Sequence, residues 1–458
     1  MRKLFPMRRA AQFLTIYIIA ALFWAGTGSA NAQSLLRDSE TELFFKEIST
    51  PIFQAAKLDP EAIKMFLIGD RSINAFVTGG QNIFIHSGLI LAADDANQLL
   101  GVIAHETGHI AGGHLNRIEN AAGRLQRVSI LSMILAAATI AAGAGDAGFA
   151  IMSLGSTISY GKLATFSRVQ EASADAASIK YLNSSNVSAL GLEQFFRKLH
   201  SQEFNAGVGL EKDLFMRSHP LTADRLTFIR DLAQASHLYD KPVRPDWQRR
   251  FKRVRGKLYG YMRDPNETFA RYPHEDHSVE ARLARSYAWH KLSELEKALI
   301  EVDALLKDKP KDPYFLEMKG QIMLENGKLN DAIPYLRKSV AYSNGDPLIM
   351  TSLSFALLSP EDPALAREAV GLLKRVVKLD HDNPTAWYQL GRGYSIMKDE
   401  ARANLAVAEY FIKTDRPYDA HVKARQAYRT LPKNSPEWHQ AGDIIVEAKY
   451  MLEKKKER

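Results

Sequence analysis

The spacing of hydrophobic positions changes several times along the chain, and each change predicts a different element. Apolar and polar residues alternate in Ala75–Val77 and Asn82–His86, with Gly79-Gly80 between them, which predicts a β-hairpin. Asp59–Leu67 has the pattern of the first turns of a helix. Leu99–Ala104 is a continuous apolar stretch that predicts a buried helix. The N-terminal half is therefore expected to be mainly α-helical, with one small sheet.

From residue 277 onward the pattern becomes a series of repeated helix pairs. Trp387, Leu390, Gly391 and Tyr394 have the spacing that opens a tetratricopeptide repeat. A second set is Leu316, Gly320, Gly327, Ala332 and Leu336, and a third is Ala420, Ala424, Ala427 and Pro432. Turns at Asp308–Asp312, Asn344–Pro347, His381–Pro384 and Pro432–Pro436 predict about four degenerate repeats over 277–453, with a phase slip near Lys398–Ala403. Such an array forms a concave surface for partner segments, or else a plain helical lid.

The segment 236–276 between these regions is strongly basic. Trp247, Phe251, Val254 and Leu258 have helical spacing and predict the buried stripe of an amphipathic helix. The basic residues among them then form its solvated face. A surface for acidic lipid or an acidic partner is the alternative.

Val128–Ala144 is seventeen residues long and contains no charge. Three interpretations compete: a buried helical hairpin, a membrane-facing or mobile flap beside the functional site, and a transmembrane helix. Its length is at the lower limit for crossing a bilayer, and its alanines and glycines weaken the hydropathy.

The N-terminus has the three parts of a signal peptide. Arg2, Lys3, Arg8 and Arg9 precede the uncharged stretch Phe13–Ala25, and Ala30-Asn31-Ala32 is a small-residue cleavage site. Residues 1–32 therefore predict export to the periplasm, with an uncleaved anchor as the alternative. Their removal takes away four cations and lowers the formal net charge from +8 to +4. That charge is too mild to indicate nucleic-acid binding. The chain has no cysteine, so its stability must come from core burial and metal.

The main candidate metal-binding and catalytic residues lie in an HExxH motif, His105-Glu106-Thr107-Gly108-His109. Two residues four apart leave one face of a helix, so both imidazoles can bind one zinc ion. Glu106 then lies near the open coordination position, where it can take a proton from a zinc-bound water. We expect one Zn²⁺ per chain, although a histidine pair that merely packs is the alternative.

A catalytic zinc ion needs a third protein ligand. His114 comes one residue too early for the HExxHxxGxxH pattern, and on a continuing helix it would point away from His105, so we interpret it as structural or surface. Glu171 is the better ligand. It lies four residues before Asp175 in a segment of strong helix formers, so the two carboxylates share a face. Asp175 can then orient a ligand imidazole, although a solvated acidic pair is the alternative.

HExxH, the Glu171-x-x-Ala174-Asp175 run, and Ser218-His219-Pro220 with Arg225 resemble the gluzincin peptidases related to the CAAX prenyl proteases. Asn74-Ala75-Phe76 also resembles that family's active-site strand. The resemblance implies that an edge strand, here Asn82–His86, binds substrate as an added strand. With the signal peptide and the repeats, the chain is similar to the BepA-type periplasmic proteases, which act in outer-membrane protein assembly and quality control.

Two residues have roles that the sequence leaves open. Pro220 restricts His219 to an extended conformation, and the preceding loop Gln202–Asp213 contains two glycines. The His219 imidazole could take the fourth metal position and hold the enzyme inactive, as the resemblance implies, or it could be a loop histidine before a helix over Leu221–Leu232. Arg225 either stabilises the oxyanion or braces the site.

The sequence thus predicts a mainly α protein: a helical zincin-like catalytic domain with a small β-hairpin or sheet over 40–235, a basic helical joint over 236–276, and an α-solenoid of tetratricopeptide repeats. We expect a periplasmic zinc endopeptidase that acts on unfolded or misassembled proteins and binds outer-membrane assembly machinery through its repeats. The alternatives are a non-proteolytic chaperone or scaffold, and a protease anchored in the inner membrane.

Overall fold

The computed structural model describes residues 34–78, 81–114, 168–205 and 219–456. The predicted signal peptide, the apolar stretch Val128–Ala144 and the loop residues 206–213 lie outside this part of the chain. Residues 202–205, which we assigned to that loop, are instead the end of a helix. None of the described helices combines the length and hydropathy that a membrane crossing requires.

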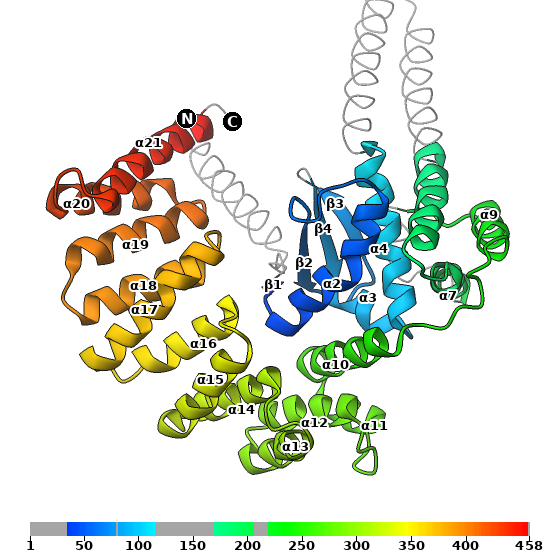
Figure 1. Cartoon of the computed structure of the whole chain (residues 1–458), viewed down its shortest axis with the longest axis horizontal. Coiled ribbons are helices and arrows are strands. Elements are labelled where there is room, and N and C mark those ends of the chain that lie inside the picture. Colours follow the sequence, from blue (N-terminus) through cyan, green and yellow to red (C-terminus); the bar gives the residue numbers. More distant parts are fainter. Residues whose placement is uncertain (1–33, 79–80, 115–167, 206–218, 457–458) are drawn as a thin grey trace, which may run out of the picture.

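A four-stranded sheet lies in the N-terminal half and faces the inside of the arc formed by the C-terminal helices (Figure 1). Its strands are β1 (Ser34–Leu36), β2 (Lys64–Gly69), β3 (Ala75–Thr78) and β4 (Asn82–His86), in the order β1-β2-β4-β3. β4 runs parallel to β2 and antiparallel to β3, while β1 runs antiparallel to β2. The predicted hairpin is therefore confirmed as β3 and β4.

Two predictions about this region are wrong. The helix expected over Asp59–Leu67 does not form, because Lys64–Gly69 pairs with β1 on one side and β4 on the other. Met65 and Leu67 point into the core from that strand, so its apolar residues serve a sheet. Asn82–His86 is not an edge strand, since β2 and β3 flank it. Among the described residues the edge on that side is β3.

Helices cover one face of the sheet and enclose the main core. They are α2 (Ser39–Ala55), α3 (Ser87–Ala92), α4 (Ala96–Ala111), the helical residues 168–184, α7 (Leu190–Asn205) and α9 (Ala223–Gln234). Phe44, Ile48 and Ile52 of α2 are fully buried, as are Ile83 of β4 and Leu100 of α4. This core fixes α4, the helix that carries HExxH.

Helix α10 (Pro245–Met262) joins the two halves, and α11 (Pro265–Arg271) follows it. The predicted apolar stripe is confirmed, with Trp247, Phe251, Val254 and Leu258 all buried. The solvated basic face is only partly correct, because Arg253 and Lys257 are buried as well. Arg253 pairs with Glu40 and Asp312, and Lys257 with Asp38 and Glu40. Since a buried cation needs a carboxylate partner, these two residues tie α10 to both halves of the chain.

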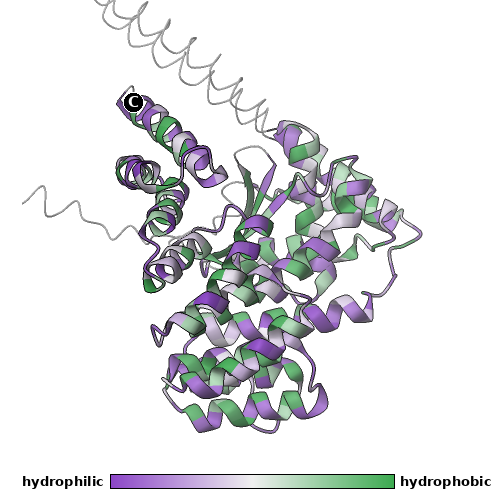
Figure 2. Ribbon diagram, turned by 60° about the vertical axis from the view of Figure 1, so that its left-hand side comes forward, coloured by the Kyte–Doolittle hydropathy of each residue, from purple (hydrophilic) through white to green (hydrophobic). Residues whose placement is uncertain are grey.

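Five helix pairs stack into the C-terminal solenoid, one more than the four that the sequence indicated (Figure 1). They are α12 (Val279–Lys291) with α13 (Leu295–Asp308), α14 (Pro313–Glu325) with α15 (Leu329–Tyr342), α16 (Pro347–Leu358) with α17 (Pro363–Leu379), α18 (Pro384–Ile396) with α19 (Glu400–Lys413), and α20 (Pro417–Thr430) with α21 (Pro436–Lys456). Apolar and polar residues interleave along these helices, as expected where each buries only one face (Figure 2).

The turns of the array are set by a recurring pair of residues. An Asp or Asn accepts backbone hydrogen bonds as the N-cap, and proline follows at the first helical position, in α14, α16, α17 and α18. The array then curves back toward the sheet. Arg37 pairs with Asp380 and Lys64 with Asp382, at 3.0 Å each, where residues 380–383 connect α17 and α18.

Candidate metal centre

Helix α4 brings the HExxH motif into the core at a place where two backbones nearly touch. The helix begins at the N-cap Asp95, whose side chain accepts from the Gln98 amide. A Cβ on Gly108 would lie 2.9 Å from the Ala174 carbonyl oxygen. Glycine at this position therefore lets α4 pack directly against the helical residues 168–184, which places Glu171 beside the two motif histidines.

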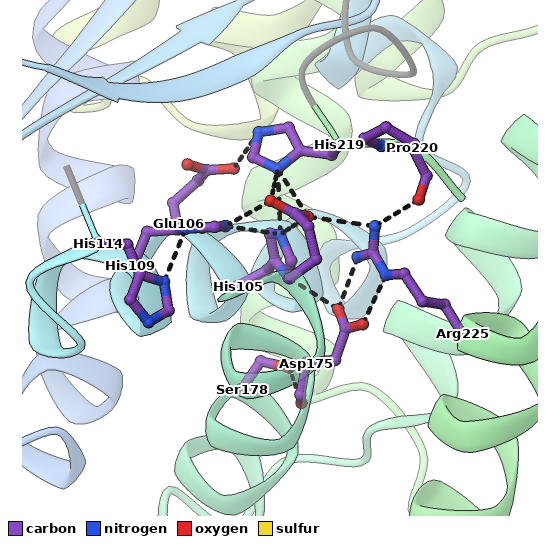
Figure 3. Close-up of polar contacts among 10 residues, drawn as sticks. His105, Glu106, His109, His114, Asp175, Ser178, His219, Pro220 and Arg225 are labelled. Carbon is purple, nitrogen blue, oxygen red and sulfur yellow. Dashed lines mark hydrogen bonds and ion pairs between the residues drawn. The ribbon is translucent and has the colours of Figure 1, made fainter. Parts of the chain in front are cut away.

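Four side chains converge with their donor atoms close together (Figure 3). His105 Nε2 lies 3.1 Å from His109 Nε2 and 3.3 Å from His219 Nδ1. Glu171 carboxylate oxygens lie 3.5 Å from His105 Nε2, 3.4 Å from His109 Nε2 and 3.1 Å from His219 Nδ1. All four donor atoms lie within 4.8 Å of one another. Donors about 2.0–2.1 Å from a tetrahedral zinc ion are separated by roughly 3.3–3.4 Å, so the spacing fits this metal.

The second nitrogen of each motif histidine also has a partner. His105 Nδ1 lies 3.0 Å from Asp175 Oδ1, and His109 Nδ1 lies 3.0 Å from His114 Nδ1. Such contacts orient an imidazole and set which nitrogen is free to bind a metal. The Asp175 carboxylate thus contacts a motif histidine. His114, which we interpreted as structural or surface, is buried and contacts His109.

Our reason for placing His114 away from the metal assumed that the helix continues. It ends at Ala111 instead, and the chain reverses through Gly112 and Gly113, which has a φ of +61°. A Cβ on Gly112 would lie 2.3 Å from the His114 ring. The two consecutive glycines directly before His114 were the feature of the sequence that could have predicted the end of the helix.

Arg225 holds the outer side of the cluster together (Figure 3). Its Nε and Nη2 donate to the two Asp175 oxygens at 2.8 and 2.9 Å. Its Nη1 lies 3.1 Å from Glu171 Oε2 and donates to the Pro220 carbonyl at 2.8 Å. The guanidinium thus touches both carboxylates and the residue next to His219, and its nitrogens are engaged with protein groups.

Glu106 is buried beside the four-donor cluster, and one of its carboxylate oxygens accepts no hydrogen bond from the described residues. This oxygen is Oε1, and His219 Nε2 lies 3.6 Å away. Burial raises the pKa of Glu106 above its usual range. A buried carboxyl in this position is suited to accept a proton from a water molecule placed between it and the four-donor cluster.

The pKa values of His105, His109 and Glu171 indicate that the cluster is suited to hold one positive charge. Burial disfavours charge on His105, but interactions with the Asp175 and Glu171 carboxylates, which accept from the charged imidazole, outweigh it and raise the His105 pKa to about 10. Burial and the neighbouring His105 lower the pKa of His109 to about 2. Burial opposes ionisation of Glu171, yet His105 and His219 lower its pKa. One shared cation, a proton or a metal ion, would satisfy all three groups.

Comparison with known proteins identifies the domain that carries this site. Residues 36–233 match the model of Peptidase family M48. This segment is a Peptidase family M48 domain. The matched region contains every residue of the four-donor cluster, together with Glu106, Asp175 and Arg225.

Several curated proteins are similar to this chain. The beta-barrel assembly-enhancing protease of Yersinia pestis is 24% identical over 70% of this chain and 65% of the relative. The Escherichia coli (strain K12) protein of the same name is 24% identical over 77% of this chain and 71% of the relative. Metalloprotease LoiP of the same strain is 31% identical over 38% of this chain and 64% of the relative. The chain thus spans just under two thirds of the Yersinia protein.

One similar solved structure is YrrB, a TPR protein described as having an unusual peptide-binding site. It is 19% identical to this chain, with a TM-score of 0.29, and the match covers 42% of this chain and 98% of YrrB.

Proposed function

We propose that this chain is a zinc-dependent endopeptidase of the periplasm, and that its repeat array recruits it to protein substrates during outer-membrane protein assembly. The observation that carries the proposal is the tetrahedral spacing of His105, His109, Glu171 and His219, with the unsatisfied Glu106 carboxylate beside them. The Peptidase family M48 match supports the reaction class. The printed names of the relatives, beta-barrel assembly-enhancing protease, support the biological setting.

His105, His109 and Glu171 would hold the zinc ion, which supplies a Lewis acid for the scissile carbonyl and lowers the pKa of water. Glu106 takes the proton from the attacking water and passes it to the leaving amine, the role its buried carboxyl fits. Asp175 keeps the His105 Nε2 free of a proton by engaging Nδ1. Arg225 braces both carboxylates, since it donates to both Asp175 oxygens and lies 3.1 Å from Glu171 Oε2.

His219 occupies the position of a fourth donor, which supports the interpretation of a latch. Its Nδ1 lies within 3.3 Å of His105 Nε2 and 3.1 Å of Glu171 Oε2, where a catalytic water or substrate would need to be. An imidazole there excludes water from the open position, so hydrolysis requires His219 to leave. The Arg225 bond to the Pro220 carbonyl holds the adjacent backbone in place.

Glu106→Gln tests the catalytic assignment. The substitution keeps the shape of the side chain and every predicted ligand, so bound zinc and the unfolding midpoint should remain near the wild-type values. Hydrolysis of a fluorogenic unfolded protein should fall by about 10²–10⁴-fold, because the general base is gone. Glu61→Gln, which removes the same charge from an exposed pair with Lys46, is the matched control and should hydrolyse normally. A Glu106→Gln protein that cleaves the reporter at close to the wild-type rate would refute the assignment.

A further inference from the structure

A cavity of about 540 Å³ lies where the repeat array meets the peptidase domain. It is lined by the start of α2 and the residues just before it, by α10, and by the first helices of four successive repeats, α12, α14, α16 and α18. Figure 1 shows how the array passes from α10 beneath the peptidase domain and curves up through α16. The volume is in the range of sites that take a ligand of several groups, so it exceeds what one side chain needs.

The charges on the cavity wall are not balanced. Both cations that line it are already engaged: Arg37 pairs with Glu42 and Asp380, while Lys257 pairs with Asp38 and Glu40. Glu317 of α14 has no ion-pair partner among the described residues. Its one side-chain contact is a long hydrogen bond of 3.4 Å from Ser352. The wall therefore presents one acidic side chain that forms no ion pair within the described residues.

Aromatic side chains line the same cavity as Glu317. Tyr314 lies one turn before Glu317 on α14, Phe355 of α16 is 43% exposed, and Tyr287 of α12 stands edge-on to Tyr261 with ring centroids 6.2 Å apart. Ring faces attract cations, most strongly where water is partly excluded. A carboxylate among aromatic walls is a chemical match for a positively charged group with an apolar stem.

The raised pKa of Glu317 agrees with the lack of an ion-pair partner among the described residues. Burial, with Asp38 and Asp346 nearby, raises its pKa to about 8, although Lys257 and the Ser352 hydroxyl oppose the shift. The carboxyl is thus mostly protonated at neutral pH. A cation placed against it would favour the ionised form, and binding would release a proton.

We propose that this cavity binds an arginine or lysine side chain of a polypeptide lying along the concave face of the array, with Glu317 as its anionic partner and Tyr287, Tyr314 and Phe355 as its aromatic walls. The inference rests on the proposed adaptor role of the repeats and does not depend on peptide hydrolysis. A polypeptide is the occupant because the cavity is lined by four successive repeats, a length that suits an extended segment and exceeds what a single cation requires.

The test uses a short, capped, fluorescein-labelled peptide with one arginine at its centre and its twin with neutral citrulline at that position. Binding is measured by fluorescence anisotropy to the full chain carrying Glu106→Gln, so that neither peptide is cleaved. The arginine peptide should bind roughly tenfold more tightly than the citrulline peptide. Glu317→Gln should bring the two affinities together. Glu447→Gln, the same charge change on an exposed residue of α21, should leave the preference intact.

The pH dependence gives a second readout. Between pH 6 and pH 8 the affinity for the arginine peptide should rise, because Glu317 must lose its proton to pair with the cation, whereas the citrulline peptide should show little change. Equal affinities for the two peptides, absence of binding, or a preference that survives Glu317→Gln in a protein with wild-type unfolding would each overturn the inference. Hydrolysis by the parent chain is unaffected by those outcomes, so the peptidase proposal stands or falls separately.

Discussion

Asp175→Asn probes the layer of residues behind the metal ligands. Asp175 is fully buried and accepts two hydrogen bonds from Arg225, Nε on Oδ2 and Nη2 on Oδ1, while His105 Nδ1 lies 3.0 Å from Oδ1. Asparagine has the same shape but one oxygen and one NH₂ group. In the better of its two orientations the oxygen faces His105 and Nη2, and the NH₂ group then meets the Arg225 Nε–H head-on. The opposite orientation is worse, because both Oδ1 contacts become donor against donor.

The size of the effect follows from these contacts. One charge-assisted hydrogen bond is lost and a buried donor is left unpaired, which costs about 1.5–3 kcal/mol of folding free energy. The loss stays below the roughly 3–5 kcal/mol for breaking a buried pair outright, since Glu171 still neutralises Arg225. Zinc affinity should fall by about 10–100-fold, because the His105 imidazole loses the negative charge that orients it.

Two measurements check this prediction: urea unfolding in the presence of a chelator, and zinc competition with a chromophoric chelator. Asp231→Asn is the matched control. It removes the same charge from an exposed pair with Arg230 on α9, and both quantities should stay near wild type. Zinc affinity within threefold of wild type in Asp175→Asn would refute the role we assign to this carboxylate, whatever happens to folding stability.

Three further outcomes are expected. Glu171→Ala should weaken zinc binding by at least about tenfold in the same competition assay, and full zinc retention would move the third ligand elsewhere. His219→Ala should raise hydrolysis of an unfolded reporter and self-cleavage while zinc stays bound, whereas an inactive protein, or one without zinc, would exclude the latch. Glu317→Gln should change the pH dependence of urea unfolding: the stability that protonated Glu317 contributes is complete below its ordinary pKa and is lost as pH rises toward 8, so the parent chain should lose stability relative to the variant between pH 5 and pH 8.

Much of the local structure follows from short-range rules that the sequence carries in full. HExxH places two imidazoles on one helical face wherever the helix forms, because the geometry depends only on residues four apart. The β3-β4 hairpin is similar, since its strands are close in the sequence and each supplies the other's hydrogen bonds. The repeat boundaries are set by capping residues followed by proline, which act within a single turn.

The errors arise where a residue's environment comes from distant parts of the chain. Lys64–Gly69 is a strand because β4, which follows later in the sequence, pairs with it. The local sequence pattern does not predict that pairing. Arg253 and Lys257 look like the exposed face of a basic helix until Asp38, Glu40 and Asp312 are brought against them from both halves. Their burial is acceptable only because those carboxylates arrive.

The sequence by itself determined the chemistry of this protein: two histidines and a base on one helix, acidic residues on another, and a repeat array behind them. The tertiary structure decided which residues from other elements contact these groups. It returned His114 to His109 through a glycine turn, set His219 as a fourth donor, and joined Arg225 to both carboxylates. Spacing within an element depends on local backbone geometry, which the sequence encodes directly, whereas contact between elements depends on how the whole core packs.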